Sequence, residues 1–289
     1  MDNAPTTSDF SADAHAQKSA EIWAEPLARM LAAGQRPPRP SALKTSAAFG
    51  WRAMLKIKHM PEQLFDVTAL PVMLVLLYTF LFGGALVGST REYVQFLLPG
   101  MMVMSVIMIT MYTGVAINID VRRGVFDRFR TLPIWRPSPM VGYLLGDTIR
   151  YTVASTVIFL VGLTMGFRPV GGAHGVLAGM LLLLVFSFAL SWVWTMFGLM
   201  LRSEKSVMVV STTVMFPLTF LSSILVNPDT MPGWLQVFVD NSPVTHLCEA
   251  VRGLMTGSWP EVAIAWVLAW TGVLMLVFAP VTMWLYARK

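Results

Sequence analysis

Long apolar stretches alternate with short polar segments along this chain. Six stretches of 17 to 26 residues contain no Asp, Glu, Lys, Arg or His: Val67–Val87, Phe96–Asn118, Tyr151–Phe167, Val176–Leu201, Ser206–Val226 and Val262–Ala287. A membrane-spanning helix needs about 20 consecutive apolar residues, with a range of about 17 to 25. We therefore predict an all-α membrane protein with six transmembrane helices. The expected spans are residues 67–87, 96–118, 143–167, 176–201, 206–226 and 262–287.

The composition agrees with this prediction. Of the 289 residues, 55% are hydrophobic and only 13% are charged, whereas soluble domains carry about 25% charged residues. This excludes an ordinary soluble enzyme and a long disordered protein. Because the six stretches lack ionisable side chains, they offer no evident proton relay or voltage sensor. If the protein transports a substrate, the energy is expected to come from a separate chain.

The basic residues predict the orientation of the helices. Eighteen of the 21 Lys and Arg residues lie in residues 1–66, 119–150, 202–205 and 288–289, which alternate with segments that hold only Arg91, Arg168 and Arg252. Basic residues are enriched on the cytoplasmic side of a membrane. We therefore expect a multi-pass protein of the cell membrane with both termini cytoplasmic. Since the basic residues are shared among separate loops, the net charge of +5 does not predict nucleic-acid binding.

The N-terminal region divides into a tail and a helix. Residues 1–45 lack the apolar core of a signal peptide, and we expect a disordered cytoplasmic tail. Residues 46–62 are expected to form a basic amphipathic helix in the cytoplasmic membrane interface, ended by Pro61. Thr45, Arg52, Lys56 and His59 share one stripe of this helix, opposite Ala47, Met54 and Ile57. Trp51 flanks the stripe, and Lys58 must snorkel to reach water.

Residues 119–139, called the coupling loop below, form the longest internal cytoplasmic segment. Phe126, Phe129 and Trp135 are large apolar groups on an expected cytoplasmic surface, which indicates a docking site; alternatively, they pack against the bilayer interface. The Ser138-Pro139 pair provides N-cap chemistry for the next helix, which is expected to begin before the membrane. That helix carries Asp147 and Arg150 as a potential i,i+3 ion pair.

Residues 227–261 are expected to lie outside the cell as a re-entrant helical hairpin. One short helix is predicted at Pro232–Val239, and a second from Ser242-Pro243 to Gly257 with a possible Glu249–Arg252 pair. Non-spanning backbone at membrane depth is tolerated only where protein or a water-filled cavity surrounds it. The hairpin is therefore a candidate gate, with a simple outer loop as the alternative.

Known catalytic motifs are missing from the sequence. It contains no G-x-x-x-x-G-K-[ST] nucleotide-binding loop and no C-x-x-C pair, and Cys248 is its one cysteine. We therefore expect no metal site, and no cofactor bound by this chain. His246, Cys248 and Glu249 form the one local cluster of potential catalytic groups. Two other classes stay open: a lipid-modifying enzyme that uses His246 and Glu249, and a membrane scaffold that only recruits partners.

Several stretches resemble a known family. They are G-W-R-A-M-L-K-I-K-H-M-P-E-Q-L-F-D-V-T at 50–68, G-V-F-D-R-F-R-T-L-P-I-W-R-P at 124–137, F-P-L-T-F-L-S-S-I at 216–224 and G-W-L-Q-V-F-V-D-N-S-P-V-T-H at 233–246. The chain resembles the permease subunits of ATP-binding-cassette type-2 exporters from residue 45 onward. It is most similar to the daunorubicin/doxorubicin-resistance permeases of actinobacteria.

The resemblance implies a homodimer that pairs with two copies of a separate ATP-binding subunit, which binds ATP and Mg. It also implies export of anthracycline-like drugs or lipidic natural products, with a glycolipid or polysaccharide exporter as the alternative. A bulky apolar cargo agrees with the 21 Met, 17 Phe and 10 Trp residues. The implied coupling residues are Gly124, Phe126, Asp127, Arg128, Arg130, Leu132 and Pro133. From span position alone, Phe82, Met104, Tyr112 and Phe216 are expected on the substrate path.

Overall fold

A computed structural model describes residues 41–59, 61–86, 89–126, 137–224 and 231–288, which belong to one compact unit, Ser41–Lys289. Within these ranges the regular structure is entirely helical. The helices are α2 (Ala42–His59), α3 (Pro61–Leu86), α4 (Thr90–Arg122), α6 (Ser138–Thr164), α7 (Gly172–Met200), α8 (Glu204–Phe220), α9 (Gly233–Asp240), α10 (Pro243–Thr256) and α11 (Glu261–Arg288). The expected tail at 1–45 falls almost wholly outside the described residues.

Four helices of the described chain are long and apolar enough to cross a membrane: residues 91–122 of α4, and α6, α7 and α11. They contain the second and sixth expected spans and most of the third and fourth. The first expected span overlaps α3, which holds a shorter apolar segment, Thr68–Leu81, and the fifth overlaps α8, which has 17 residues. The all-α membrane fold is confirmed, and the count of six spans stays a prediction.

The helix ends follow the sequence signals closely. Helix α2 ends at His59, two residues before the predicted break at Pro61. Helix α10 ends at Thr256, and its C-cap Gly257 has a φ of 84°, in the left-handed region that favours glycine. The predicted N-cap of α6 is wrong by one residue. Pro137 occupies that position, and Ser138 is already helical, because the proline ring fixes a φ (−72°) that suits the helix start.

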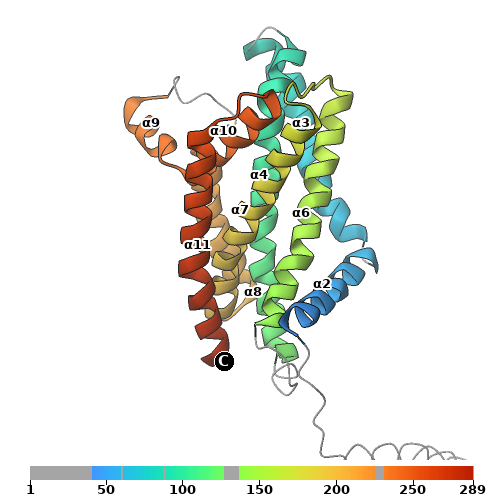
Figure 1. Ribbon diagram of the computed structural model, residues 1–289, viewed down its shortest axis with the longest axis vertical. Coiled ribbons are helices and arrows are strands. Elements are labelled where there is room, and N and C mark those ends of the chain that lie inside the picture. The colour runs from blue at the N-terminus through green and yellow to red at the C-terminus, as the bar shows by residue number, and fades with distance from the viewer. Residues whose placement is uncertain (1–40, 60, 87–88, 127–136, 225–230, 289) are drawn as a thin grey trace, which may run out of the picture. The chain divides into compact units, whose positions relative to one another are not determined.

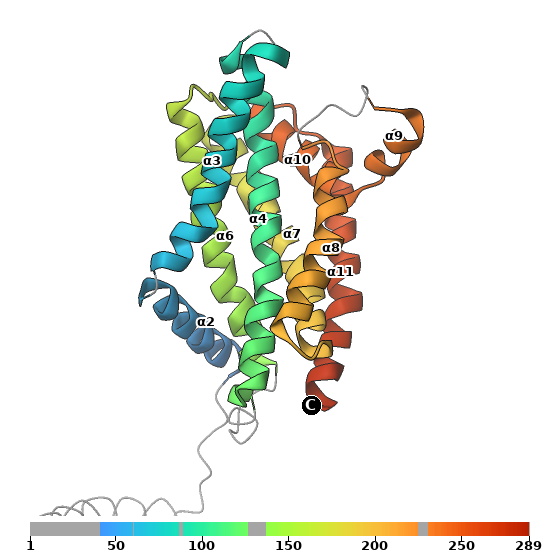
Figure 2. The same cartoon turned by 180° about the vertical axis from the view of Figure 1, so that it is seen from behind.

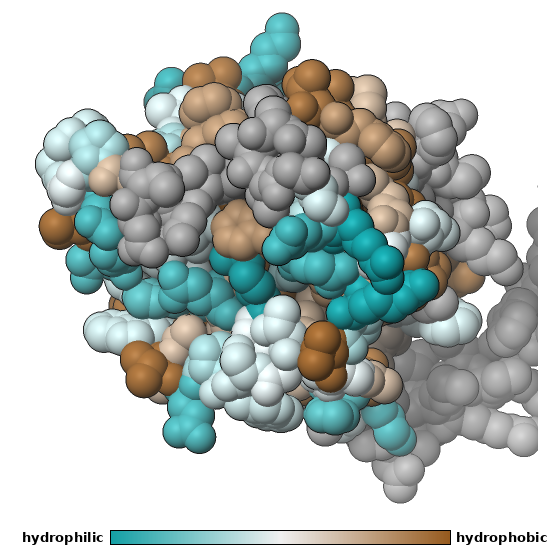
Figure 3. Space-filling model, turned by 90° about the horizontal axis from the view of Figure 1, so that it is seen from above, coloured by the Kyte–Doolittle hydropathy of each residue, from teal (hydrophilic) through white to brown (hydrophobic). Residues whose placement is uncertain are grey.

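The elements separate into two ends of the helical bundle (Figure 1). Helix α2 and the C-terminal end of α11 lie at one end, and α9 and α10 lie at the other. Seen from the α10 end, hydrophilic side chains cover much of the surface, with hydrophobic side chains scattered between and around them (Figure 3). This separation agrees with the predicted alternation of inner and outer segments.

Helix α4 is the centre of the packing, with α3 on one side and α8 on the other (Figure 2). Leu97, Leu98, Met101, Met102 and Ile107 of α4 are fully buried. Lipid supplies little hydrophobic force between helices, so close backbone approach and polar bonds hold such bundles together. The burial of α4 therefore depends on how closely its neighbours approach it.

The closest approach joins α4 to α7. A Cβ atom on Gly114 would lie 2.3 Å from the carbonyl oxygen of Trp194, and one on Gly198 would lie 2.4 Å from the carbonyl oxygen of Gly114. One turn further, Nδ2 of Asn118 donates to the carbonyl oxygens of Gly198 and Leu201, both at 2.8 Å. The two helices are thus in direct backbone contact and are bonded at the end of α7.

We predict that Gly114→Ala lowers the thermal unfolding midpoint by roughly 3–10 °C, because the added methyl group forces the α4 and α7 backbones apart. The midpoint is measured on the purified protein in detergent. Gly272→Ala in α11 is the matched control, since nothing lies within 4 Å of its added Cβ. Equal midpoints for the two variants would contradict the proposed role of the contact.

Candidate functional site

The coupling loop begins where α4 ends. Arg123 is the C-cap residue of α4, and Gly124 follows it with a φ of 66° while its N–H donates to the carbonyl oxygen of Val121 at 3.1 Å. Only glycine adopts this conformation without strain, so Gly124 lets the chain leave α4 and re-enter helical conformation at Val125. The predicted importance of Gly124 therefore has a conformational basis.

Phe126 occupies a buried pocket of aromatic rings. It is 5% exposed, and its ring centroid lies 6.2 Å from that of Tyr143 in α6 and 5.5 Å, edge to face, from that of Tyr286 in α11. The expectation that Phe126 lies on an exposed surface is wrong, because α6 and α11 enclose it together with Met140 and Leu199. The start of the coupling loop is thereby anchored to two other helices.

Most of the coupling loop is outside the described residues. This applies to Asp127, Arg128, Arg130, Leu132 and Pro133, and to the aromatic residues Phe129 and Trp135. Their expected roles stay predictions.

Helix α2 packs against the first turns of α6. A Cβ on Gly142 would lie 2.2 Å from Cβ of Phe49, and one on Gly50 would lie 3.5 Å from Cβ of Leu145. Thr45, expected on the polar stripe, is buried (8% exposed). This correction has a steric reason: a small side chain lets α2 approach α6, and the hydroxyl group of Thr45 bonds to the carbonyl oxygen of Ser41.

The outward face of α2 agrees with an interfacial position. Trp51 (62% exposed) and Leu55 (40% exposed) lie one turn apart on it. Exposed apolar groups on a helix at the end of a membrane bundle suit the interface between headgroups and acyl chains. The side chains of Arg52, Lys56 and Lys58 are outside the described part of the structure.

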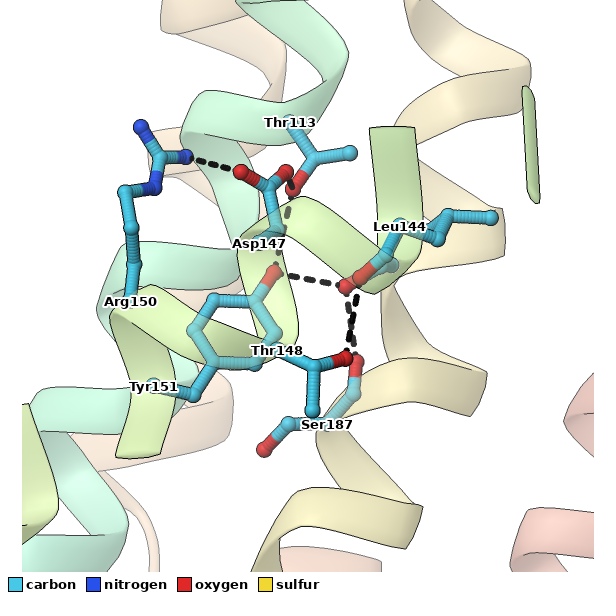
Figure 4. A network of polar contacts seen from close by, with 8 residues as sticks. Thr113, Leu144, Asp147, Thr148, Arg150, Tyr151 and Ser187 are labelled. Atoms are coloured by element: carbon cyan, nitrogen blue, oxygen red, sulfur yellow. Dashed lines mark hydrogen bonds and ion pairs between the residues drawn. The ribbon is translucent and has the colours of Figure 1, made fainter. Parts of the chain in front are cut away.

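A buried polar network joins α4, α6 and α7 (Figure 4). The predicted ion pair is confirmed, with Nη2 of Arg150 2.6 Å from Oδ1 of Asp147 and both side chains about nine-tenths buried. Thr113 of α4 donates to Oδ2 of Asp147 at 2.5 Å, and its hydroxyl oxygen lies 3.0 Å from that of Tyr151. The Tyr151 hydroxyl oxygen lies 2.8 Å from Oγ of Ser191 in α7.

This network adds partners to the ion pair that the sequence predicted. Asp147 and Arg150 belong to a helix that can span the membrane, and Asp147 bonds to Thr113, which lies within the second expected span. The ionisable pair thus lies within the expected third span, residues 143–167, and bonds to a residue of the expected second span. The two opposite charges pair with each other, and the Thr113 hydroxyl group bonds to the carboxylate.

The residues expected on the substrate path do not share one environment. Met104 is buried in the core (4% exposed), whereas Tyr112 and Phe216 are 40% and 56% exposed. Tyr112 belongs to α4 and Phe216 to α8, and these helices contact each other where Oγ1 of Thr212 lies 4.0 Å from Sδ of Met111. The ring of Phe216 stacks on that of Phe220, with centroids 4.3 Å apart. The Phe82 side chain is outside the described residues.

The potential catalytic cluster does not assemble into a catalytic arrangement. His246 stacks on Trp266, and the fully buried Cys248 directs Sγ toward the carbonyl oxygen of Ser223 at 3.8 Å. Burial raises the pKa of Glu249, and within the described part of the chain its carboxyl group forms no hydrogen bond or ion pair with His246 or Cys248. In the described ranges, no group of three His, Cys, Asp or Glu residues is placed to hold a metal ion. The geometry thus offers no support for a lipid-modifying enzyme.

Comparison with known proteins identifies the family. The sequence profile described as ABC-2 type transporter matches residues 47–256, which is most of the chain. The chain belongs to the ABC-2 type transporter family. This confirms the resemblance found in the sequence, and it agrees with a membrane permease subunit.

Two of the similar proteins are named for drug resistance. The daunorubicin resistance ABC transporter permease protein DrrB1 of Streptomyces coeruleorubidus is 46% identical over 263 residues, which cover 91% of this chain and 93% of the relative. The probable doxorubicin resistance ABC transporter permease protein DrrC of Mycobacterium tuberculosis is 29% identical over 59% of this chain and 62% of its own length. ABC transporter G family member 20 of Dictyostelium discoideum is 26% identical, over 67% of this chain and 27% of the relative.

We predict that Asp147→Asn lowers the unfolding midpoint by roughly 6–12 °C, because it leaves the Arg150 guanidinium buried without its counter-charge. The double variant Asp147→Asn/Arg150→Gln should lose less than the sum of the two single variants. Thr152→Val is the control, since its exposed hydroxyl group bonds only within α6 in the described structure. Additive losses in thermal unfolding would show that the two charges do not act as a pair.

Proposed function

We propose that this chain is the membrane-spanning permease subunit of an ATP-driven efflux transporter that exports bulky hydrophobic, anthracycline-like drugs. The observation that carries the proposal is the 46% identity, over almost the full length of both chains, to a permease named for daunorubicin resistance. The sequence lacks a nucleotide-binding loop, so ATP and Mg bind to a separate subunit.

In the proposed assembly, two copies of the chain pair with two ATP-binding subunits in the cell membrane, with all termini of the permease cytoplasmic. The described surface includes apolar faces for lipid or a second copy. Helix α3 exposes Leu70, Met73, Leu77, Phe80 and Leu81. Six spans per copy follow if α3 and α8 also cross the bilayer.

The proposed coupling route begins at the cytoplasmic loop. When the ATP-binding subunit displaces residues 124–133, the buried ring of Phe126 moves with them. This ring contacts Tyr143 in α6 and Tyr286 in α11. Helix α2 moves with α6, because their backbones are in contact at Gly142. The Asp147 network then passes the displacement of α6 to α4 and α7.

The proposed cargo path runs along the accessible sides of α4 and α8. Tyr112 and the stacked pair Phe216 and Phe220 offer flat aromatic surfaces, and the hydroxyl groups of Thr212 and Thr213 are exposed on the same helix as the pair. Planar aromatic drugs bind such rings by offset stacking. Helices α9 and α10 form the re-entrant hairpin that closes the outer end of this path.

The test of the proposed function is transport of daunorubicin into inverted membrane vesicles that contain this chain and its ATP-binding subunit. We predict ATP-dependent uptake that is absent when either subunit is omitted. Vesicles that move a fluorescent glycolipid but not daunorubicin would overturn the drug assignment and favour the glycolipid alternative.

For the coupling route, we predict that Phe126→Leu lowers ATP-driven uptake severalfold while the ATP-binding subunit still copurifies, because the ring contacts that transmit the push are lost. Charge reversal at Asp127 or Arg130 should have the same effect. The matched control is Phe159→Leu, which removes an edge-to-face ring pair of α6 that the route does not use. Normal uptake by Phe126→Leu would count against the route.

A further inference from the structure

Arg252 is the one Lys or Arg residue of the expected outer segment 227–261, and its guanidinium group reaches α4 and the segment that follows α8. Its Nε donates to the carbonyl oxygen of Phe96 in α4 at 3.2 Å, and its Nη2 donates to the carbonyl oxygen of Ser223 at 3.1 Å. Its Cζ also lies 3.9 Å from the centroid of the Phe96 ring. One guanidinium group from α10 therefore bonds both to α4 and to the segment that follows α8.

Two more side chains of α10 contact the same serine. Oγ1 of Thr245 accepts from the N–H of Ser223 at 3.4 Å, and Sγ of Cys248 lies 3.8 Å from its carbonyl oxygen. Thr245, Cys248 and Arg252 are spaced i, i+3 and i+7, which places them on one face of the helix. We call these three residues and Ser223 the Ser223 clamp.

The clamped segment also lies directly against α4. A Cβ on Gly100 would be 2.6 Å from the carbonyl oxygen of Ile224, so no side chain fits between them. Ser223 and Ile224 are fully buried although they follow the last helical residue, Phe220. The outer end of α8 is thus fixed between α4 and α10 by hydrogen bonds and close contact rather than by a continuous helix.

The expected ion pair of Arg252 with Glu249 does not form. Among the described residues, the one carboxylate–guanidinium pair within 4 Å joins Asp147 and Arg150. The guanidinium group is directed instead to backbone carbonyl oxygens that belong to two other helical regions. Hydrogen bonds of this type are stronger than neutral ones, but they are lost when either acceptor moves away. Such bonds can hold α10, α4 and the segment after α8 together and still allow these segments to separate.

We propose that Arg252 is the latch of the outer gate: it holds the outer end of α8 against α4 in the closed conformation, and its release opens the space between these helices. In this assignment Arg252 is a positioning residue, because it acts through Ser223 and Phe96. The passage of cargo through this opening rests on the proposed function, whereas the latch itself does not.

The chain contains its own reporter for the latch. Cys248 is its single cysteine, it is fully buried, and it belongs to the clamp. Burial raises the pKa of the Cys248 thiol, so the reactive thiolate is scarce while the clamp is closed. Labelling by a bulky maleimide therefore requires opening, and its rate measures how often the clamp opens.

The experiment follows maleimide labelling of Cys248 in the complex with its ATP-binding subunit, reconstituted in nanodiscs so that both faces are accessible. For Arg252→Gln we expect labelling about tenfold to a hundredfold faster than in the wild type. Arg252→Lys keeps the charge but lacks the planar guanidinium group that reaches both carbonyl oxygens, so the labelling rate of this variant should be intermediate. Arg168→Gln is the matched control, because this exposed arginine bonds to carbonyl oxygens at the end of α6 and beyond, outside the clamp.

Nucleotide dependence separates a latch from general loosening. In the wild type, ATP should accelerate labelling; in Arg252→Gln, labelling should be fast with and without ATP. A wild-type rate in Arg252→Gln, or equal acceleration in Arg168→Gln, would overturn the latch. If Arg252→Gln fails to assemble, the labelling rate of Arg252→Lys is compared with that of the wild type instead: faster labelling supports the latch, and an equal rate overturns it. Absence of daunorubicin uptake together with the expected labelling pattern would reject the drug assignment alone.

Discussion

The contact between α4 and α7 is the constraint on which the rest of the structure depends. Between lipid-exposed helices, hydrophobic burial contributes little to association, so backbone proximity and polar bonds decide which helices stay together. Gly114 and Gly198 bring the two backbones into contact, and Asn118 bonds the same helices one turn away. With this pair fixed, α6, α8 and α10 each find a rigid surface against which to pack.

A second layer of polar bonds makes α6 part of this rigid unit. Asp147 and Tyr151 of α6 reach Thr113 in α4 and Ser191 in α7, so displacement of α6 alone would leave buried polar groups unsatisfied. At its first turns the same helix touches α2 and the ring of Phe126. Helix α6 therefore links the surface where a motor subunit can act to the interior of the bundle.

The sequence predicted most of the helices, because apolar length and terminal residues are local properties. Pro61 separates two helices, and Gly257 ends α10 as expected. The partners of individual side chains could not be predicted from local patterns. Phe126 was expected at a surface and is buried by rings from α6 and α11, which are 17 and 160 residues away along the chain. Likewise, nothing near Arg252 in the sequence indicates that its acceptors are Phe96 and Ser223.

The length of α8 has a consequence for the surrounding bilayer. Its 17 residues rise by about 26 Å, which is less than the hydrocarbon thickness of about 30 Å. If α8 crosses the bilayer, the backbone that follows it lies at membrane depth, where its carbonyl groups need protein partners, and Arg252 supplies one for Ser223. A short helix of this kind favours local thinning of the membrane beside it. A spanning α8 would therefore place the neighbouring lipid under elastic strain, and the stability of its outer end would depend on the thickness of the host membrane.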